Sequence, residues 1–221
     1  MPSGKGTRPK KGTRAKKVSK ADQAQQKLAD ALRAGQYQAN APVPELPTAE
    51  RFDIGRTPAR EAILQLVAVG LLVKKDNHRA HVPSLARDCV LDLVDAFFEI
   101  EAACLRLAVL HMTAAKRIEI RQMTKALQAQ AALPDLVAVA VALRKFVRAN
   151  CGNRELAAIA EFVEMKFGPY RNLEVDADKR DLRFARILAK ALSRPEGQAP
   201  VRSLRTRMLG IRKAIAENWR S

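Results

Sequence analysis

Arg56 and Arg60 stand at the start of a segment whose apolar residues recur at helical spacing. Thr57 and Pro58 favour a helix start here, because a threonine side chain can cap the first backbone N–H groups and proline fits the first turn. A guanidinium at the leading end of a helix can bind a phosphate or, through two parallel hydrogen bonds, the edge of a guanine. These residues therefore offer recognition of a polyanion, and Thr57 can add a hydrogen bond to a phosphate.

The charge of the whole chain points to the same chemistry. Its 221 residues include 40 Lys and Arg against 23 Asp and Glu, a net charge of +17. Such an excess favours a partner whose phosphates it can neutralise. Residues 1–20 contain eight basic and no acidic residues, so we expect a disordered basic tail. This tail is either an arm that follows phosphates or a leader that aids solubility.

Other classes of protein find little support. The sequence shows no carboxylate pair near a histidine, no zinc signature, no P-loop and no GxSxG motif, so we expect no enzyme. Apolar stretches are broken before the ~18 residues that a membrane span requires. The three cysteines lie far apart without a CxxC motif, which fits reduced thiols, packed as small core residues, in a cytoplasmic protein.

The elements that must position the arginines follow from hydrophobic spacing. We expect helices over 21–34, about 48–52, and from Thr57-Pro58 to Gly70, then strands over 71–75 and 80–82. Three helices followed by a two-stranded ribbon form a winged helix-turn-helix, whose second helix of the turn enters the major groove of duplex DNA. The ribbon, or wing, carries four side chains placed to contact the DNA backbone: Lys74, Lys75, His78 and Arg79.

Beyond Pro83 the sequence predicts helices only. Ser84 is expected to cap the first, and the helices cover approximately 84–112, 113–132, 134–150, 153–167, 178–193 and 201–219. The expected fold class is therefore mainly α, an N-terminal winged helix-turn-helix with a two-stranded wing plus a C-terminal all-helical bundle. The expected domains are a tail (1–20), a DNA-binding domain (21–83) and a helical domain (84–221).

The run from Gly55 to Ile63, with Leu66 and Gly70-Leu71-Leu72 after it, resembles the signature of GntR-type bacterial regulators. Upstream the match extends through Leu32, Gly35, Tyr37, Glu45 and Ala49. Downstream, Ile100-Glu101, Leu107-Ala108, Gly152-Asn153 and Leu156 are similar to the all-helical ligand-binding domain of the FadR branch. The resemblance implies a homodimer that binds a pseudo-palindromic operator in double-stranded DNA. It also implies that the helical domain dimerises and senses a small metabolite, often a carboxylate or sugar acid.

The chain departs from this branch where many members bind a metal. The aspartate and first histidine of that ligand set align with Ala140 and Arg144, the last histidine with Arg207, and the remaining one loosely with Phe184. Because arginine repels a cation, we expect no metal and no cofactor. Arg144 and Arg207 could instead bind a small organic anion through bidentate hydrogen bonds. Alternatively, they pair with acids such as Glu101 or Glu161, or face solvent.

Two functional hypotheses follow from the sequence. In the first, the protein is a sequence-specific transcriptional regulator controlled by an anionic metabolite in the helical domain. In the second, it is an effector-independent or architectural DNA-binding protein with a degenerate sensing domain. A high ratio of specific to non-specific DNA affinity distinguishes the first from a purely architectural binder.

Overall fold

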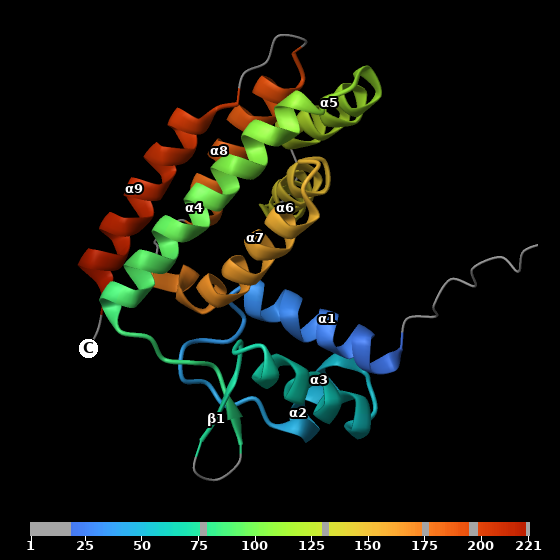
Figure 1. Cartoon of the computed structure of the whole chain (residues 1–221), viewed down its shortest axis with the longest axis vertical. Helices are drawn as coiled ribbons and strands as arrows, with labels where there is room; N and C mark the ends of the chain where they lie inside the picture. The colour runs from blue at the N-terminus through green and yellow to red at the C-terminus, as the bar shows by residue number, and fades with distance from the viewer. Residues whose placement is uncertain (1–18, 76–78, 130–132, 174–176, 195–198, 220–221) are drawn as a thin grey trace, which may run out of the picture.

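The computed structural model describes residues 19–75, 79–129, 133–173, 177–194 and 199–219. Within these residues it consists of helices and one two-stranded antiparallel sheet, arranged as a small N-terminal unit and a larger helical bundle (Figure 1). The predicted fold class is confirmed. Of the predicted basic tail, residues 1–18 lie outside the described residues, whereas Ser19 and Lys20 already belong to the first helix as its N-cap and first residue.

The N-terminal unit contains three helices and the sheet. Its elements are α1 (Lys20–Arg33), α2 (Glu45–Phe52), α3 (Arg56–Ala68), β1 (Val73–Lys74) and β2 (Ala80–His81). Ser19 and Asp22 form a capping box that fixes the start of α1. Leu28 and Leu32 of α1 share a buried core with Ile63 and Leu66 of α3, so α1 and α3 are packed as one body.

The wing is shorter than the predicted strands. The sheet pairs Val73 with His81 and Lys74 with Ala80. Leu71 and Leu72, which the sequence assigned to the first strand, are instead buried in the core of the N-terminal unit. The backbone N–H groups of both leucines donate to the Leu66 carbonyl at the end of α3, at 2.9 and 3.2 Å, so these residues close that helix and do not extend the sheet.

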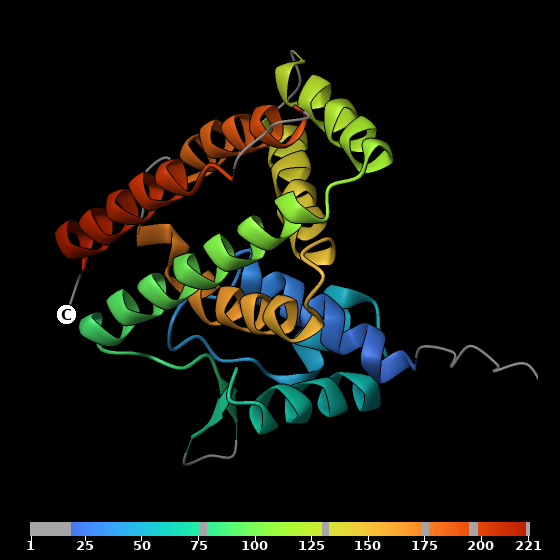
Figure 2. The ribbon, with the colours of Figure 1, turned by 45° about the horizontal axis from the view of Figure 1, so that its top comes forward.

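The bundle contains the remaining helices. These are α4 (Arg87–Leu110), α5 (Ala114–Gln128), α6 (Leu133–Ala149), α7 (Arg154–Phe167), the 3-10 helix η1 (Gly168–Leu173), α8 (Ala177–Leu192) and α9 (Val201–Asn218). The long helix α4 lies between α7 and α9 along its first half, and its second half joins the core formed with α5, α6 and α8 (Figure 2). None of the described helices is long and apolar enough to cross a membrane.

The two N-caps predicted from the sequence are wrong. The N-cap of α3 is Gly55 and not Thr57, so Arg56 is the first helical residue and Thr57 the second. The N-cap of α4 is Ala86 and not Ser84. Neither Gly55 nor Ala86 makes a side-chain cap, whereas the expected starts at Thr113 and Asn153 are capped by those side chains.

The N-terminal unit and the bundle meet where the end of α1 lies against α7 and η1 (Figures 1 and 2). A Cβ atom on Gly168 would lie 1.9 Å from the carbonyl oxygen of Leu32, so glycine allows the two backbones to approach. The hydroxyl of Tyr170 accepts a hydrogen bond from the Leu85 N–H (2.8 Å) and donates one to the Pro83 carbonyl (3.2 Å). These contacts hold the connection between the wing and α4 against the bundle.

Candidate functional site

The first candidate site lies at the turn between α2 and α3. Asp53 ends α2 in the left-handed conformation (φ 50°), which aspartate tolerates better than most residues. Two residues later Gly55 begins α3, and α2 packs against α3. The turn, α3 and the wing together form the end of the molecule that is farthest from the bundle (Figure 1).

Arg56 and Arg60 project from the first two turns of α3. Their side chains remain 75% and 68% exposed. Both pair with Glu45 at the start of α2: the distances from Glu45 carboxylate oxygens are 3.5 Å to Arg56 Nε and 3.7 Å to Arg60 Nε. Thr57 is exposed beside them. The structure therefore brings Arg56, Thr57 and Arg60 together at one helix end, next to a carboxylate that sequence reasoning did not place there.

The wing residues are placed less uniformly. Lys74 is exposed on β1 and Arg79 is exposed just before β2. The Lys75 ammonium donates a hydrogen bond to the side-chain oxygen of Asn40, in the connection between α1 and α2. His78 lies outside the described residues. The wing thus presents basic side chains on the same end of the molecule as α3, with Lys75 turned toward its neighbouring segment.

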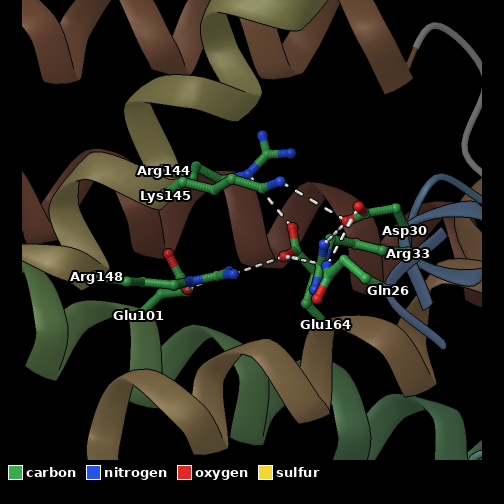
Figure 3. Close-up of polar contacts among 8 residues, drawn as sticks. All are labelled: Gln26, Asp30, Arg33, Glu101, Arg144, Lys145, Arg148 and Glu164. Carbon is green, nitrogen blue, oxygen red and sulfur yellow. Dashed lines mark hydrogen bonds and ion pairs between the residues drawn. The ribbon is translucent and has the colours of Figure 1, made fainter. Parts of the chain in front are cut away.

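A second candidate site lies inside the bundle, where buried charges from four helices meet (Figure 3). Glu164 of α7 is 3% exposed and accepts a hydrogen bond from Arg148 Nη1 at 2.6 Å. Its carboxylate also lies 3.4 Å from Arg144 Nε and 3.2 Å from Arg33 Nε. Glu101 of α4 accepts a second hydrogen bond from Arg148, at Nε, over 2.6 Å.

The two buried carboxylates respond differently to this environment. Burial alone would raise the pKa of Glu164, but the charges of Arg144, Arg148 and Arg33 outweigh it and lower the pKa below its usual value. Burial also dominates at Glu101 and raises its pKa, against the opposing charge of Arg148. Arg148 itself has a raised pKa because, despite its burial, it faces both carboxylates. At neutral pH Glu164 is therefore firmly ionised.

Arg144 and Arg207 line the same small cavity, of about 30 Å³. Its wall also includes Phe97, Phe98, Glu101, Glu164, Phe167, Phe184, Leu204 and Ile211. Arg207 and Phe184 line in addition an open groove of about 560 Å³ between α8 and α9. The structure thus places the two predicted anion-binding arginines on opposite helices, α6 and α9, of one interior space.

Sequence reasoning missed Arg148 and Arg33, which join this cluster. Arg144 and Arg148 are four residues apart on α6, so they share a helix face, and that spacing was a usable signal. Arg33 had no such signal, because its partner lies in a different part of the fold. The acid that pairs with Arg144 is Glu164, whereas Glu161, one of the acids considered, is exposed.

The histidines and cysteines that the structure describes add no further cluster. Among the residues that the structure describes, no group of three His, Cys, Asp or Glu is placed to hold a metal ion. His111 ends α4, and its Nδ1 lies 2.8 Å from the Leu107 carbonyl oxygen. Cys104 and Cys151 are buried free thiols, and burial, the nearby carboxylate of Glu101 and Cys151 raise the pKa of Cys104 to about 12. Cys89, predicted as a core residue, is exposed: it lies on the outer face of the first turn of α4, where the adjacent Val90 is the residue that is buried in the core.

Comparison with known proteins gives one family. The sequence model of "Bacterial regulatory proteins, gntR family" matches residues 20–82. Among solved structures, E. coli McbR/YncC has 22% sequence identity and a TM-score of 0.67, covering 91% of this chain and 93% of that one. A putative transcriptional regulator GntR from Rhodococcus sp. RHA1 has 17% identity and a TM-score of 0.65, covering 90% and 99%. A comparison with curated proteins gives no match.

Proposed function

The chain is a GntR-family transcriptional regulator that binds DNA, and from this premise we propose that it recognises a pseudo-palindromic operator as a homodimer. The observation that supports this most directly is the pair of exposed arginines at the start of α3, beside the basic wing. We also propose the division into a DNA-binding domain (21–83) and a helical domain (84–221). Because such a regulator acts on chromosomal DNA, we place it in the cytoplasm.

We assign different roles to the two groups of basic residues. Arg56 and Arg60 stand at the leading end of α3, where a recognition helix meets base edges, and Thr57 is placed to bond a phosphate. Lys74, Lys75, His78 and Arg79 on the wing would contact the sugar-phosphate backbone, which fixes orientation but carries little sequence information. The first backbone N–H groups of α3 receive no side-chain cap, so they can also face a phosphate.

Arg56, Thr57 and Arg60 at the start of α3 form the reading surface for DNA, and Glu45 gives this surface a second property. By pairing with both arginines it holds them over the start of α3 before DNA is present. These pairs are exposed and weak, on the order of 0–1 kcal/mol each, so DNA phosphates can displace the carboxylate. A wrong sequence that offers no bidentate partner leaves the arginines with Glu45, which favours discrimination.

A DNA-binding experiment tests this assignment. Duplexes selected from a random pool would be measured against non-specific duplex across a salt series. Arg60→Ala is expected to weaken specific binding by about 1–3 kcal/mol. Lys74→Ala is expected to weaken all sequences alike and to reduce the salt slope by about 1. Arg121→Ala, an exposed arginine of α5, is the matched control. Equal losses for Arg60→Ala and Arg121→Ala would refute the assignment.

For the bundle we propose a small organic anion as effector, bound between Arg144 and Arg207. Three guanidiniums, from Arg33, Arg144 and Arg148, contact two buried carboxylates, Glu101 and Glu164, while the more exposed Asp30 also pairs with Arg33 and Arg207 lines the same cavity. A buried excess of positive charge favours an added anion. At about 30 Å³ the cavity holds about two water molecules, so a metabolite needs more room. Movement of Arg207 or Phe184, which line both spaces, would join the cavity to the groove.

The small cavity also favours the second hypothesis, a DNA-binding protein whose helical domain no longer senses a ligand. Calorimetry of the metal-free protein with a panel of small mono- and dicarboxylates and sugar acids separates the two. If the effector proposal holds, one acid binds, Arg207→Ala abolishes binding, and Arg183→Ala, an exposed arginine of the groove, does not. No binding by any acid, with Arg144→Ala leaving DNA affinity unchanged, would leave the effector-independent protein.

A further inference from the structure

Arg33 connects the N-terminal unit to the bundle through charge. It is the last residue of α1, yet it is only 8% exposed, and its Nε lies 3.2 Å from Glu164 Oε2 of α7. Its other acidic partner, Asp30, is on its own helix, and Lys145 of α6 approaches that aspartate at 3.7 Å. Figure 3 shows Arg33 and Asp30 reaching the cluster from one side and Arg144, Lys145 and Arg148 from the other.

Glu164 is shared between these two sides. One carboxylate oxygen lies 3.4 Å from Arg144, which lines the cavity, and the other lies near both Arg33 and Arg148. Three guanidiniums therefore compete for one buried carboxylate. When one of them is taken away, the carboxylate interacts more strongly with those that remain, because little water is present to screen it.

We propose that Glu164 and Arg33 are positioning residues that transmit the state of the cavity to the DNA-binding unit. This inference rests on the proposed function, since an anion bound at Arg144 is what would withdraw that guanidinium from Glu164. Glu164 then holds Arg33 more tightly, and the end of α1 is fixed against α7. Without the anion, Arg144 weakens the contact and the end of α1 is held more loosely.

Movement of α1 reaches the reading surface because α1 and α3 share one core. Leu28 and Leu32 pack with Ile63 and Leu66, so the two helices tilt together. Of the other contacts at this junction, the Gly168 backbone approach and the Tyr170 hydrogen bonds carry no formal charge, and the Lys145–Asp30 pair is exposed and does not line the cavity. The Arg33–Glu164 pair is therefore the junction contact that an anion in the cavity can change, and in a dimer it would alter the orientation of both α3 helices.

Hydrogen exchange of the full chain tests this coupling without DNA and without an effector. Arg144→Met imitates withdrawal of the guanidinium and is expected to slow amide exchange in the last turn of α1. The expected slowing is at least about twofold, which corresponds to the lower end of the interaction energies found between neighbouring residues. In an Arg33→Met background the same substitution should have no effect there. Arg33→Lys keeps a charge and should restore part of the response. Arg183→Met is the control, since it removes an exposed arginine outside the cluster.

Each outcome has a definite meaning. Unchanged exchange in α1 after Arg144→Met, or effects of Arg144→Met and Arg33→Met that simply add, would overturn the proposal. If Arg144→Met fails to fold by circular dichroism, Arg144→Gln replaces it with the same expectation. Coupling in α1 with no organic acid bound would mean that the transmission exists and the effector proposal fails. Binding of an acid with no coupling in α1 would mean the reverse.

Discussion

Gly168 provides a direct test of how the N-terminal unit sits on the bundle. Its backbone is right-handed helical (φ −44°, ψ −49°), a conformation that alanine adopts freely, so its conformation does not require glycine. The lack of space around this residue, in contrast, does require glycine. A Cβ would lie 1.9 Å from the Leu32 carbonyl oxygen and 2.9 Å from the Cα of Arg33, both backbone atoms that cannot rotate away.

The magnitude follows from these distances. An ordinary contact begins near 3.4 Å, so the end of α1 must retreat by about 1.5 Å from its present 1.9 Å. Overpacking of this kind costs about 1–3 kcal/mol or more, against a helix-propensity gain of about 0.5–1 kcal/mol for replacing glycine by alanine. We therefore expect Gly168→Ala to lower the free energy of unfolding. The retreat would also lengthen the 3.2 Å contact between Arg33 and Glu164.

Urea unfolding followed by circular dichroism measures this effect, and the chain supplies its own control. Gly210 lies inside α9, and a Cβ there would have no atom within 4 Å among the described residues. Gly210→Ala should therefore raise the free energy of unfolding by about 0.5–1 kcal/mol. If Gly168→Ala is as stable as the wild type or more stable, α1 does not abut η1 as described, and the reasoning about this junction fails.

Three further predictions concern the charged residues. Arg148→Met should lower the free energy of unfolding by about 3–5 kcal/mol in urea titrations, since it leaves two buried carboxylates without their shared partner, whereas exposed Arg154→Met should have little effect. Relative to wild type, Glu101→Gln should become more stable as pH rises from 4.5 through the raised folded-state pKa of Glu101. Glu164→Gln should be less stable than wild type above pH 4.5, and this difference should disappear only as pH falls below 4.5. Parallel curves of stability against pH for the two variants would contradict this. Glu45→Gln should tighten binding to non-specific duplex several-fold in fluorescence anisotropy, on the order of 0.2–1 kcal/mol, because it removes a carboxylate that competes with phosphates; weaker binding would mean that Glu45 mainly positions the arginines.

The helices of the bundle could be predicted because each has a clear apolar face and local signals at its ends. The helices expected from Thr113 and from Asn153, for example, begin there, and the structure shows that these two side chains cap α5 and α7. The start of α2 was predicted at Thr48, three residues late, because two prolines precede it. Pro44 is the N-cap and Pro47 falls in the first turn, where a missing N–H costs nothing. That error concealed the role of Glu45, which stands in this additional first turn of α2 beside Arg56 and Arg60.

The interior cluster could be predicted only in part. Arg144 and Arg207 stood out because they occupy positions where the resembling family has metal ligands. Their environment could not be predicted, because it depends on tertiary pairings: Arg148 joins Glu101 across 47 residues of sequence, and Arg33 reaches Glu164 from a different unit of the fold. Spacing within one helix reports which residues share a face, but it carries no information on which helix that face meets.

Because the three cysteines differ in exposure, the protein can be labelled selectively at one of them. Cys104 and Cys151 are buried, and a thiol whose pKa is about 12 stays protonated and unreactive toward alkylating reagents. Cys89 is exposed in the first turn of α4, directly after the connection that Tyr170 holds against the bundle. A maleimide fluorophore would therefore attach at this one position under native conditions. Its emission would report movement of the wing connection without any engineered residue.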